Sequence, residues 1–156
     1  MKVETQAEVF VPKPVEAVFD HAFAVDAFTH LLRQKAPIPG VVSVVLEGGA
    51  TEVATGVRRS VTMTDKSVII EEVVRHDRPR EHSYRWLNSP GPPFSALVRR
   101  GEATWRLEPL SGGTRVVWTY WFQLSSPIAL VPMKLVVFFF RRWMQSALEN
   151  LRTELG

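Results

Sequence analysis

The sequence contains no cysteine, which excludes disulfide bonds, thiolate metal sites and a cysteine nucleophile. With 156 residues, the chain can bury about two thirds of the surface that its unfolded form exposes. We therefore expect one domain over residues 1–156 that folds without a covalent staple. Hydrophobic residues make up 46% and charged residues 22% of the chain, a balance typical of a folded globular protein and not of a disordered one.

Apolar runs of the kind used for export or membrane insertion are also lacking. Glu4 and Glu8 stand where a secretory signal would need an apolar segment, so we expect a cytoplasmic protein. The uncharged stretch 116–133 is interrupted by Pro127 and Pro132, which indicates a strand, a turn and the start of a helix rather than a membrane span.

The excess of positive charge is small. Nineteen basic and sixteen acidic residues give a net charge of +3, and two of the three arginine doublets lie close to acidic residues in the sequence. A nucleic-acid-binding protein normally concentrates its basic residues on one face. We therefore expect no nucleic-acid partner.

Familiar catalytic motifs are missing as well. The chain has neither a Gly-x-Ser-x-Gly elbow nor a glycine-rich phosphate loop. Its four histidines, His21, His30, His76 and His82, show no metal-ligand spacing, and no cluster of carboxylates supplies an oxygen cage. We expect no metal and no cofactor, and the sequence leaves open whether the protein is an enzyme.

The periodicity of apolar residues predicts the order of the elements. Residues 2–11 alternate between apolar and polar side chains, as in a half-buried strand. Helical spacing predicts helices over about 15–23, with Pro14 in the first turn, and from an Asp26 N-cap to Leu32. Turn residues divide 41–124 into six short strands, and a long helix to about Leu155 begins either at Ser126-Pro127 or after Pro132.

This order predicts an α+β fold of the helix-grip type. A seven-stranded antiparallel sheet would wrap around the long C-terminal helix, and the two short helices after the first strand would close one end. A sheet and a helix of this kind cannot close completely on each other, so we expect a cavity between them.

Several short motifs, in their order and spacing, resemble those of a known superfamily. They are Pro14–Asp20 after the opening strand, Gly56-x-x-Arg59, Glu71-Glu72 before Asp77-x-Pro79-Arg80, and Thr104–Pro109 followed by Gly112–Trp118. Together they resemble the START-like superfamily (SRPBCC, helix-grip fold), in its polyketide cyclase/dehydrase branch. The resemblance implies a central cavity for a lipid, sterol, hormone or polyketide; only some members of the superfamily are enzymes, so fold alone does not settle function.

Pairing the strands on either side of two turns suggests a polar group in this cavity. If Asp65-Lys66 is the centre of a tight turn, Arg59 faces Glu72, and Glu72 in turn faces Arg85. The face that carries these three charged residues holds more apolar side chains than the opposite face, among them Val61, Met63, Ile70 and Leu87. We predict this face to be concave, with the charged group anchoring an acidic or carbonyl-rich ligand.

Two alternatives to this anchor stay open. A register error of one residue would turn the chosen side chains to solvent and bring His82 and Tyr84 inside as acid–base candidates. The three charged residues can also form a structural ion triad without a ligand.

Aromatic residues are concentrated late in the chain, and we predict that several line the cavity. Twelve of the sixteen lie at or after Tyr84. The last hairpin places Trp105 on one face with Trp118 and Tyr120, and leaves Trp121 on the other. The remaining predicted cavity residues come from the long helix and are Phe140 and Met144.

The function most consistent with these patterns is binding of a small hydrophobic ligand (a lipid, a polyketide or another aromatic or isoprenoid metabolite). One alternative is a cofactor-free polyketide cyclase/dehydrase in which Arg59 or Arg85 polarises a carbonyl. A second is a membrane-peripheral lipid-binding or chaperone-like module.

The apolar run 135–140 has more hydrophobic faces than packing on a sheet requires. We expect burial of the excess face beneath the Pro90–Pro93 loop first, a homodimer contact second, and a membrane-surface contact with Arg141 and Arg142 third. The protein is therefore expected to be a monomer or a homodimer.

Overall fold

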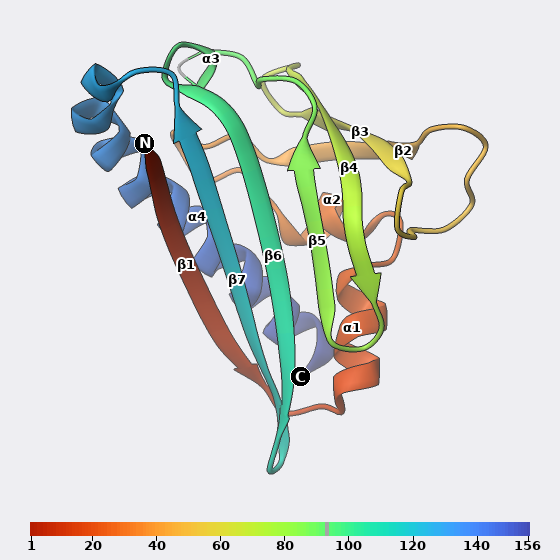
Figure 1. The fold of residues 1–156 in the computed structure, drawn as a ribbon. Helices are drawn as coiled ribbons and strands as arrows, with labels where there is room; N and C mark the ends of the chain where they lie inside the picture. Colours follow the sequence, from red (N-terminus) through yellow and green to blue (C-terminus); the bar gives the residue numbers. More distant parts are fainter. Residues whose placement is uncertain (93) are drawn as a thin grey trace.

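Seven antiparallel strands form one curved sheet in the computed structural model, which describes residues 1–92 and 94–156 (Figure 1). In space the strands follow the order β1–β7–β6–β5–β4–β3–β2. Their bounds are β1 Lys2–Val11, β2 Val41–Leu46, β3 Arg58–Met63, β4 Val68–Asp77, β5 Glu81–Trp86, β6 Val98–Leu110 and β7 Gly113–Leu124.

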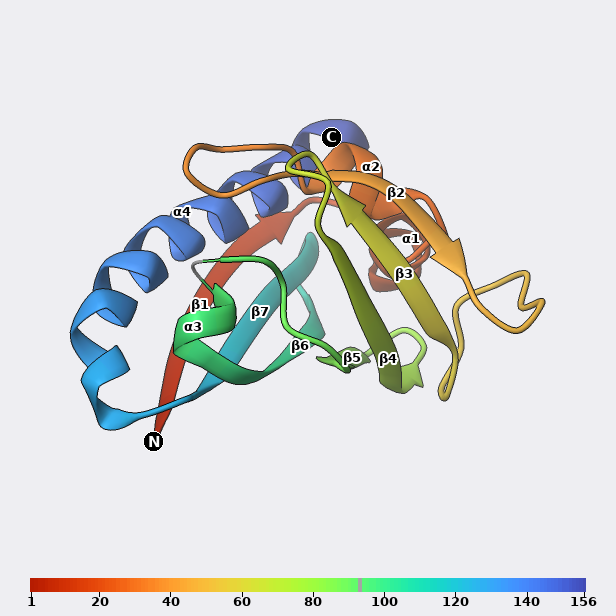
Figure 2. The same cartoon turned by 90° about the horizontal axis from the view of Figure 1, so that it is seen from above.

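The helices cover the concave side of this sheet and one of its ends (Figure 2). They are α1 Val15–Ala22, α2 Ala27–Leu31, the short α3 Phe94–Leu97, the 3₁₀ turn η1 Pro127–Ala129 and the long α4 Leu130–Leu155. Helix α4 packs along β1 and contacts α2 and β7. The predicted helix-grip fold is thereby confirmed, and the open question of where the long helix starts is resolved by a 3₁₀ turn at Pro127 that leads directly into α4.

Local sequence accounts for the burial pattern of β1 and for the start of α4. In β1 the side chains of Thr5, Ala7, Val9 and Val11 are buried, as the alternation predicts. Pro132 is the third residue of α4, where a missing backbone N–H does no harm because the first turn has no intrahelical acceptor for it. Within the described residues, no helix is long and apolar enough to cross a membrane.

The turn between β3 and β4 differs from the predicted one. It contains three residues, 64–66, because Lys66 adopts a left-handed conformation (φ 72°) and the N–H of Met63 bonds to the carbonyl of Ser67 at 2.9 Å. A two-residue turn at Asp65-Lys66 would have shifted the pairing by one residue. Arg59 therefore faces Glu71, not Glu72.

A second irregularity lies between β4 and β5. The pairing shifts between Val73 and Arg75, so that Glu72 still faces Arg85 while His76 faces His82. The predicted partnership of Glu72 with Arg85 is correct, but both side chains lie on the outer face of the sheet. The predicted concave face is right for β3 and wrong for β4 and β5, where Ile69, Glu71, Val73, His82, Tyr84 and Trp86 point inward.

The apolar run at the start of α4 is only partly covered. Phe140 is buried and Phe139 is half-buried, but Leu135 and Phe138 are 62% and 55% exposed. The expected cover, the Pro90–Pro93 loop, includes Pro93, which lies outside the described residues. Because Leu135 and Phe138 are exposed, the predicted burial is wrong for these two residues.

Candidate functional site

A cavity of about 240 Å³ lies between the concave face of the sheet and α4. Val61, Met63 and Ile69 form its wall on the sheet, and Val136, Phe140 and Trp143 form its wall on α4. Segments 37–39 and 90–92 also contribute to the lining. Because Leu135 lines the cavity and is also 62% exposed, the cavity opens to the surface beside the first turns of α4.

Aromatic rings from β5, β7 and α4 build one side of the cavity. The rings of Tyr84 and Tyr120 lie 6.0 Å apart, and that of Phe140 lies 4.9 Å from Tyr120 in an edge-to-face arrangement. Trp86 donates a hydrogen bond from Nε1 to the Tyr120 hydroxyl at 3.3 Å. This hydrogen bond fixes the orientation of both rings in the wall.

Room for the Trp86 ring depends on a glycine in the neighbouring strand. A Cβ atom on Gly101 of β6 would lie 2.6 Å from Cε3 of that ring. The glycine is thus required by a close approach and not by an unusual backbone conformation.

At the inner end of the cavity lies a buried polar cluster built from β3, β4 and β5. Arg59 donates from Nε to Oε1 of Glu71 at 2.8 Å and from Nη2 to Nε2 of His82 at 3.2 Å. Arg59 and Glu71 are 3% and 4% exposed, and Glu71 lines the cavity. The rings of Phe28 and Tyr84 each lie 4.8 Å from the guanidinium carbon.

The direction of hydrogen bonding in this cluster assigns the histidine tautomers. A guanidinium group can only donate, so His82 Nε2 accepts and its Nδ1 carries the proton. The Nδ1 atoms of His82 and His76 lie 3.0 Å apart, so His82 donates to His76. Burial and the charge of Arg59 hold the pKa of His82 well below its ordinary value, which keeps this ring neutral at pH 7.

The acidic groups of the cavity are shifted in the opposite direction. Burial raises the pKa of Glu71, and the neighbouring Arg59 limits the rise. Burial also raises the pKa values of Tyr84 and Tyr120, so both phenols are neutral. Trp143 adds an indole N–H that is buried and has no hydrogen-bond partner within 1–92 and 94–156. The cavity lining thus offers neutral donors and one carboxyl group.

The twelve residues predicted to bind a ligand fall into three groups. Val61, Met63, Tyr120 and Phe140 line the cavity. Another four are buried in the core next to it without lining it: Arg59, Trp105, Trp118 and Met144. Four lie on the outer face of the sheet and do not reach it: Ile70, Glu72, Arg85 and Leu87.

The predicted meeting of Arg59, Glu72 and Arg85 is therefore wrong. Glu72 accepts from Arg85 at 2.6 Å and lies 3.5 Å from Arg58, so an ion triad does form, but it lies on the solvent side. Trp121 also lies on the outer face, where the ammonium of Lys2 sits 4.3 Å from the centre of its ring.

Glu71 and Trp143 were missed by the sequence prediction. Trp143 follows Phe140 by three residues and Val136 by seven, so helical spacing alone was enough to place it on the inner face of α4. Glu71 is adjacent to Glu72, and only the length of the turn at 64–66 decides which of the two faces inward.

The family to which the chain belongs follows from a match over nearly its whole length. The family model described as polyketide cyclase/dehydrase and lipid transport matches residues 2–156. The chain belongs to this family. No curated protein matches the chain.

Solved structures share the fold of this chain. The TTHA0849 protein of Thermus thermophilus is 25% identical with a TM-score of 0.73, covering 98% of this chain and 97% of the other. Ara h 8.0201 is 15% identical with a TM-score of 0.68, covering 99% and 98%. The di-domain ARO/CYC protein BexL of the BE-7585A biosynthetic pathway is 15% identical with a TM-score of 0.69, and the match covers 99% of this chain but 50% of BexL.

Proposed function

We propose that the protein binds one small, mainly apolar molecule in the cavity between the sheet and α4. The observation that carries this proposal is a hydrophobic cavity of about 240 Å³ that reaches the surface beside Leu135 and ends at Glu71. Binding sites for small molecules combine apolar walls with a few fixed polar groups in this way. Membership of a family described as polyketide cyclase/dehydrase and lipid transport supports the same function.

The polar end of the cavity favours a hydroxyl or carbonyl group over an anion. Arg59 is already neutralised by Glu71, and its Nη2 donates to His82. An anionic ligand would therefore meet a carboxyl group instead of a free cation. The neutral donors Tyr84, Tyr120 and Trp143 suit a ligand oxygen, and Glu71 suits a ligand hydroxyl.

Filling the cavity tests this function. Val61→Phe adds a ring to the cavity wall at a side chain that is 2% exposed. We expect native mass spectrometry of the wild-type protein to detect a retained small molecule, and the Val61→Phe variant to lose it. The control is Val74→Phe, on the outer face of β4, where the side chain is 49% exposed. Equal retention by both variants would place the ligand outside this cavity.

A second candidate function is cofactor-free cyclisation or dehydration of a carbonyl-rich substrate. It is favoured by Glu71, a cavity carboxyl group whose pKa is raised towards the range useful for a general base, beside the neutral phenol of Tyr84. Acetylacetone is a suitable probe because a base exchanges its central C–H with deuterium in D₂O. We expect an enzyme of this kind to accelerate the exchange, and Glu71→Gln to abolish the acceleration. If the wild-type protein does not accelerate the exchange, the catalytic function is contradicted and ligand binding is the remaining proposed function.

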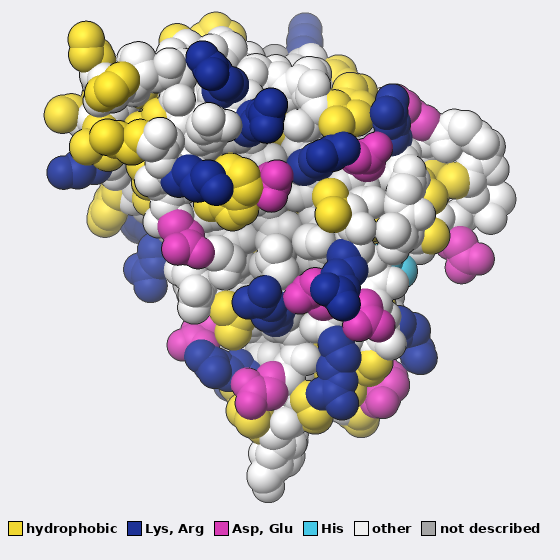
Figure 3. Space-filling model, in the orientation of Figure 1, with side chains coloured by type: hydrophobic (Ala, Val, Ile, Leu, Met, Phe, Trp, Pro, Cys, Tyr) yellow, Lys and Arg dark blue, Asp and Glu magenta, His cyan; other side chains and the backbone are white. Residues whose placement is uncertain are grey.

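The surface around the mouth of the cavity suggests where the ligand comes from. Four exposed apolar side chains follow one face of the segment that leads into α4 and of its first turns: Ile128, Val131, Leu135 and Phe138. In Figure 3, hydrophobic side chains gather over this part of the molecule with Lys and Arg beside them. No aspartate or glutamate occurs between Glu108 and Glu149 in the sequence, whereas Lys134, Arg141 and Arg142 are exposed. These charges complement an anionic lipid surface, from which an apolar ligand can pass into the cavity.

A further inference from the structure

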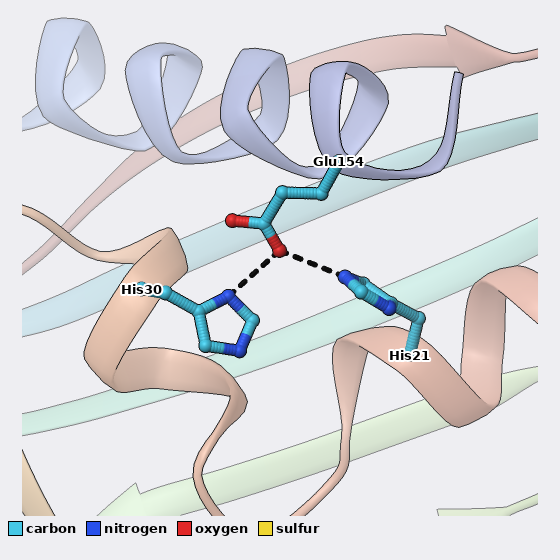
Figure 4. A group of neighbouring side chains, drawn as sticks. All are labelled: His21, His30 and Glu154. Carbon is cyan, nitrogen blue, oxygen red and sulfur yellow. Dashed lines mark hydrogen bonds and ion pairs between the residues drawn. The ribbon is translucent and has the colours of Figure 1, made fainter.

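Three side chains from three different helices converge at the end of the molecule where the chain terminates (Figure 4). His21 is in the last turn of α1, His30 in the last turn of α2, and Glu154 in the last turn of α4. Oε1 of Glu154 lies 2.8 Å from Nε2 of His21 and 2.7 Å from Nδ1 of His30. All three atoms lie within 4.8 Å of one another.

Two imidazole nitrogens and a carboxylate oxygen are atom types that ligate zinc. Zn²⁺ takes imidazole nitrogens at about 2.0–2.1 Å and carboxylate oxygens at similar distances, and it accepts water as a fourth ligand. Around a tetrahedral ion, ligand atoms at that distance lie about 3.3 Å apart. The two nitrogen–oxygen distances, 2.8 and 2.7 Å, are about 0.5 Å shorter than this, so the side chains would rotate apart slightly to admit the ion.

The surroundings favour a cation and hold the ligands in place. The side chains of His21, His30 and Glu154 are 33%, 37% and 22% exposed, so ions in solution can reach them although much of each side chain is covered. The C-terminal ends of α1 and α4 also direct their partial negative charge towards this point. Asn150 donates from Nδ2 to the carbonyl of Leu31 at 2.9 Å, which ties α4 to α2 one turn away from the cluster.

We propose that His21, His30 and Glu154 form a Zn²⁺ site, with water completing the coordination. In the structure both imidazoles direct a nitrogen at the carboxylate: Nε2 of His21 donates a hydrogen bond to it, and Nδ1 of His30 lies at ion-pair distance. On binding, each neutral ring carries its proton on the other nitrogen, Nδ1 of His21 and Nε2 of His30, and turns a lone pair to the ion. The ion would then staple the ends of α1, α2 and α4 together.

The site is independent of the proposed cavity ligand, since none of its three residues lines the cavity. Its effect on the cavity is indirect: Phe28 and Leu32, at α2 and its end, belong to the cavity wall. Holding α2 against α4 therefore stiffens one end of the cavity.

Isothermal titration with ZnCl₂ after treatment with EDTA tests the proposal. We expect one Zn²⁺ per chain, an upward shift of the melting temperature on binding, and a visible absorption band of tetrahedral character when Co²⁺ replaces Zn²⁺. His30→Ala and Glu154→Gln should each lower the affinity by about tenfold or more. Glu149→Gln, an exposed glutamate on the same helix, is the matched control and should leave the affinity unchanged.

Circular dichroism of each variant checks that it is folded, and Glu154→Gln preserves the size of the side chain. Failure of the wild-type protein to take up Zn²⁺ would overturn the proposal. So would equal affinity in the wild-type, His30→Ala and Glu154→Gln proteins, because the ion would then bind elsewhere.

Discussion

Arg59 and Glu71 form a buried ion pair at 2.8 Å, and they do so on the face of the sheet opposite to the exposed pair of Arg85 with Glu72. Two adjacent glutamates of β4 thus have partners of the same kind in two very different environments. Removing one partner of a buried pair leaves an uncompensated charge, whereas an exposed charge is solvated by water. The two pairs therefore contribute differently to stability.

Glu71→Gln should lower the free energy of unfolding by about 3–5 kcal/mol, because Arg59 would stay buried without a counter-charge. Glu72→Gln should have a much smaller effect. Denaturation in urea at neutral pH measures both. Equal losses in the two variants would contradict the assigned register. The double variant Arg59→Met with Glu71→Leu should regain most of the loss, since it removes both charges and keeps the volume.

Stability should fall as the pH drops below about 6.5, in part because of His82. Its pKa is lowered in the folded protein, first by burial and then by Arg59. The unfolded chain consequently binds one more proton than the folded one below the ordinary histidine pKa, and the free energy of unfolding decreases by up to about 1.4 kcal/mol per pH unit for that proton. Urea denaturation between pH 7.5 and 5.5 should show this slope.

The variant His82→Gln isolates this contribution, since glutamine does not titrate. Its slope over the same pH range should be shallower than that of the wild-type protein. An identical slope would mean that His82 is not the group that takes up the proton.

Gly101→Ala should destabilise the protein by about 1–3 kcal/mol, because the new methyl group overlaps the ring of Trp86 and cannot be accommodated without moving a cavity wall. The Cβ position lies 2.6 Å from the ring at this site, whereas at Gly91 the nearest atom lies 3.8 Å away. Gly91→Ala is therefore the matched control. Thermal unfolding and tryptophan fluorescence measure the outcome, and similar melting temperatures for both variants would contradict the packing described for Trp86.

Flotation with vesicles tests the role of the exposed face of α4. We expect binding to vesicles that contain phosphatidylglycerol, weaker binding to pure phosphatidylcholine, and loss of binding in high salt. Phe138→Ser should reduce the bound fraction about tenfold, as expected from withdrawing one large apolar side chain. Val45→Ser, on the outer side of β2 and 60% exposed, should bind like the wild-type protein.

Binding that persists unchanged in Phe138→Ser would assign the lipid contact to another surface. A concentration-dependent dimer that dissociates in the same variant, without any vesicle binding, would instead identify the face as an interface between two copies of the chain.

The architecture could be predicted from the sequence because the type and order of the elements depend on the periodicity of apolar residues. An element can be predicted from such a pattern even if its boundaries are misplaced by one or two residues. This holds for the alternation in 2–11, the helical spacing in 15–23 and the long apolar stripe after 132. The interior of the sheet does not tolerate such errors. One additional residue in the turn at 64–66 reverses the faces of β4, and counting apolar side chains could not detect this.

That count was misleading because this sheet has polar side chains on its inner face and apolar side chains on its outer face. Glu71, His82 and Arg59 are inside, while Val68, Val74 and Leu87 are exposed on the outer face. A polar cluster that satisfies its own hydrogen bonds can be buried at little cost, but its mutual pairing is not visible in a single strand. For the same reason the histidine–glutamate cluster on the three helices escaped notice, since Glu154 is far from His21 and His30 in the sequence.

The hydrogen bonds that connect Arg59, His82 and His76 all run in one direction, because each group donates to the next one outward from the cavity. A proton that reaches His76 from solvent cannot hop inward, since His82 Nδ1 already holds one and Arg59 cannot accept. These side chains therefore do not conduct protons from bulk solvent to the inner end of the cavity on this side. A molecule seated beside Glu71 would therefore receive no proton along this series of side chains.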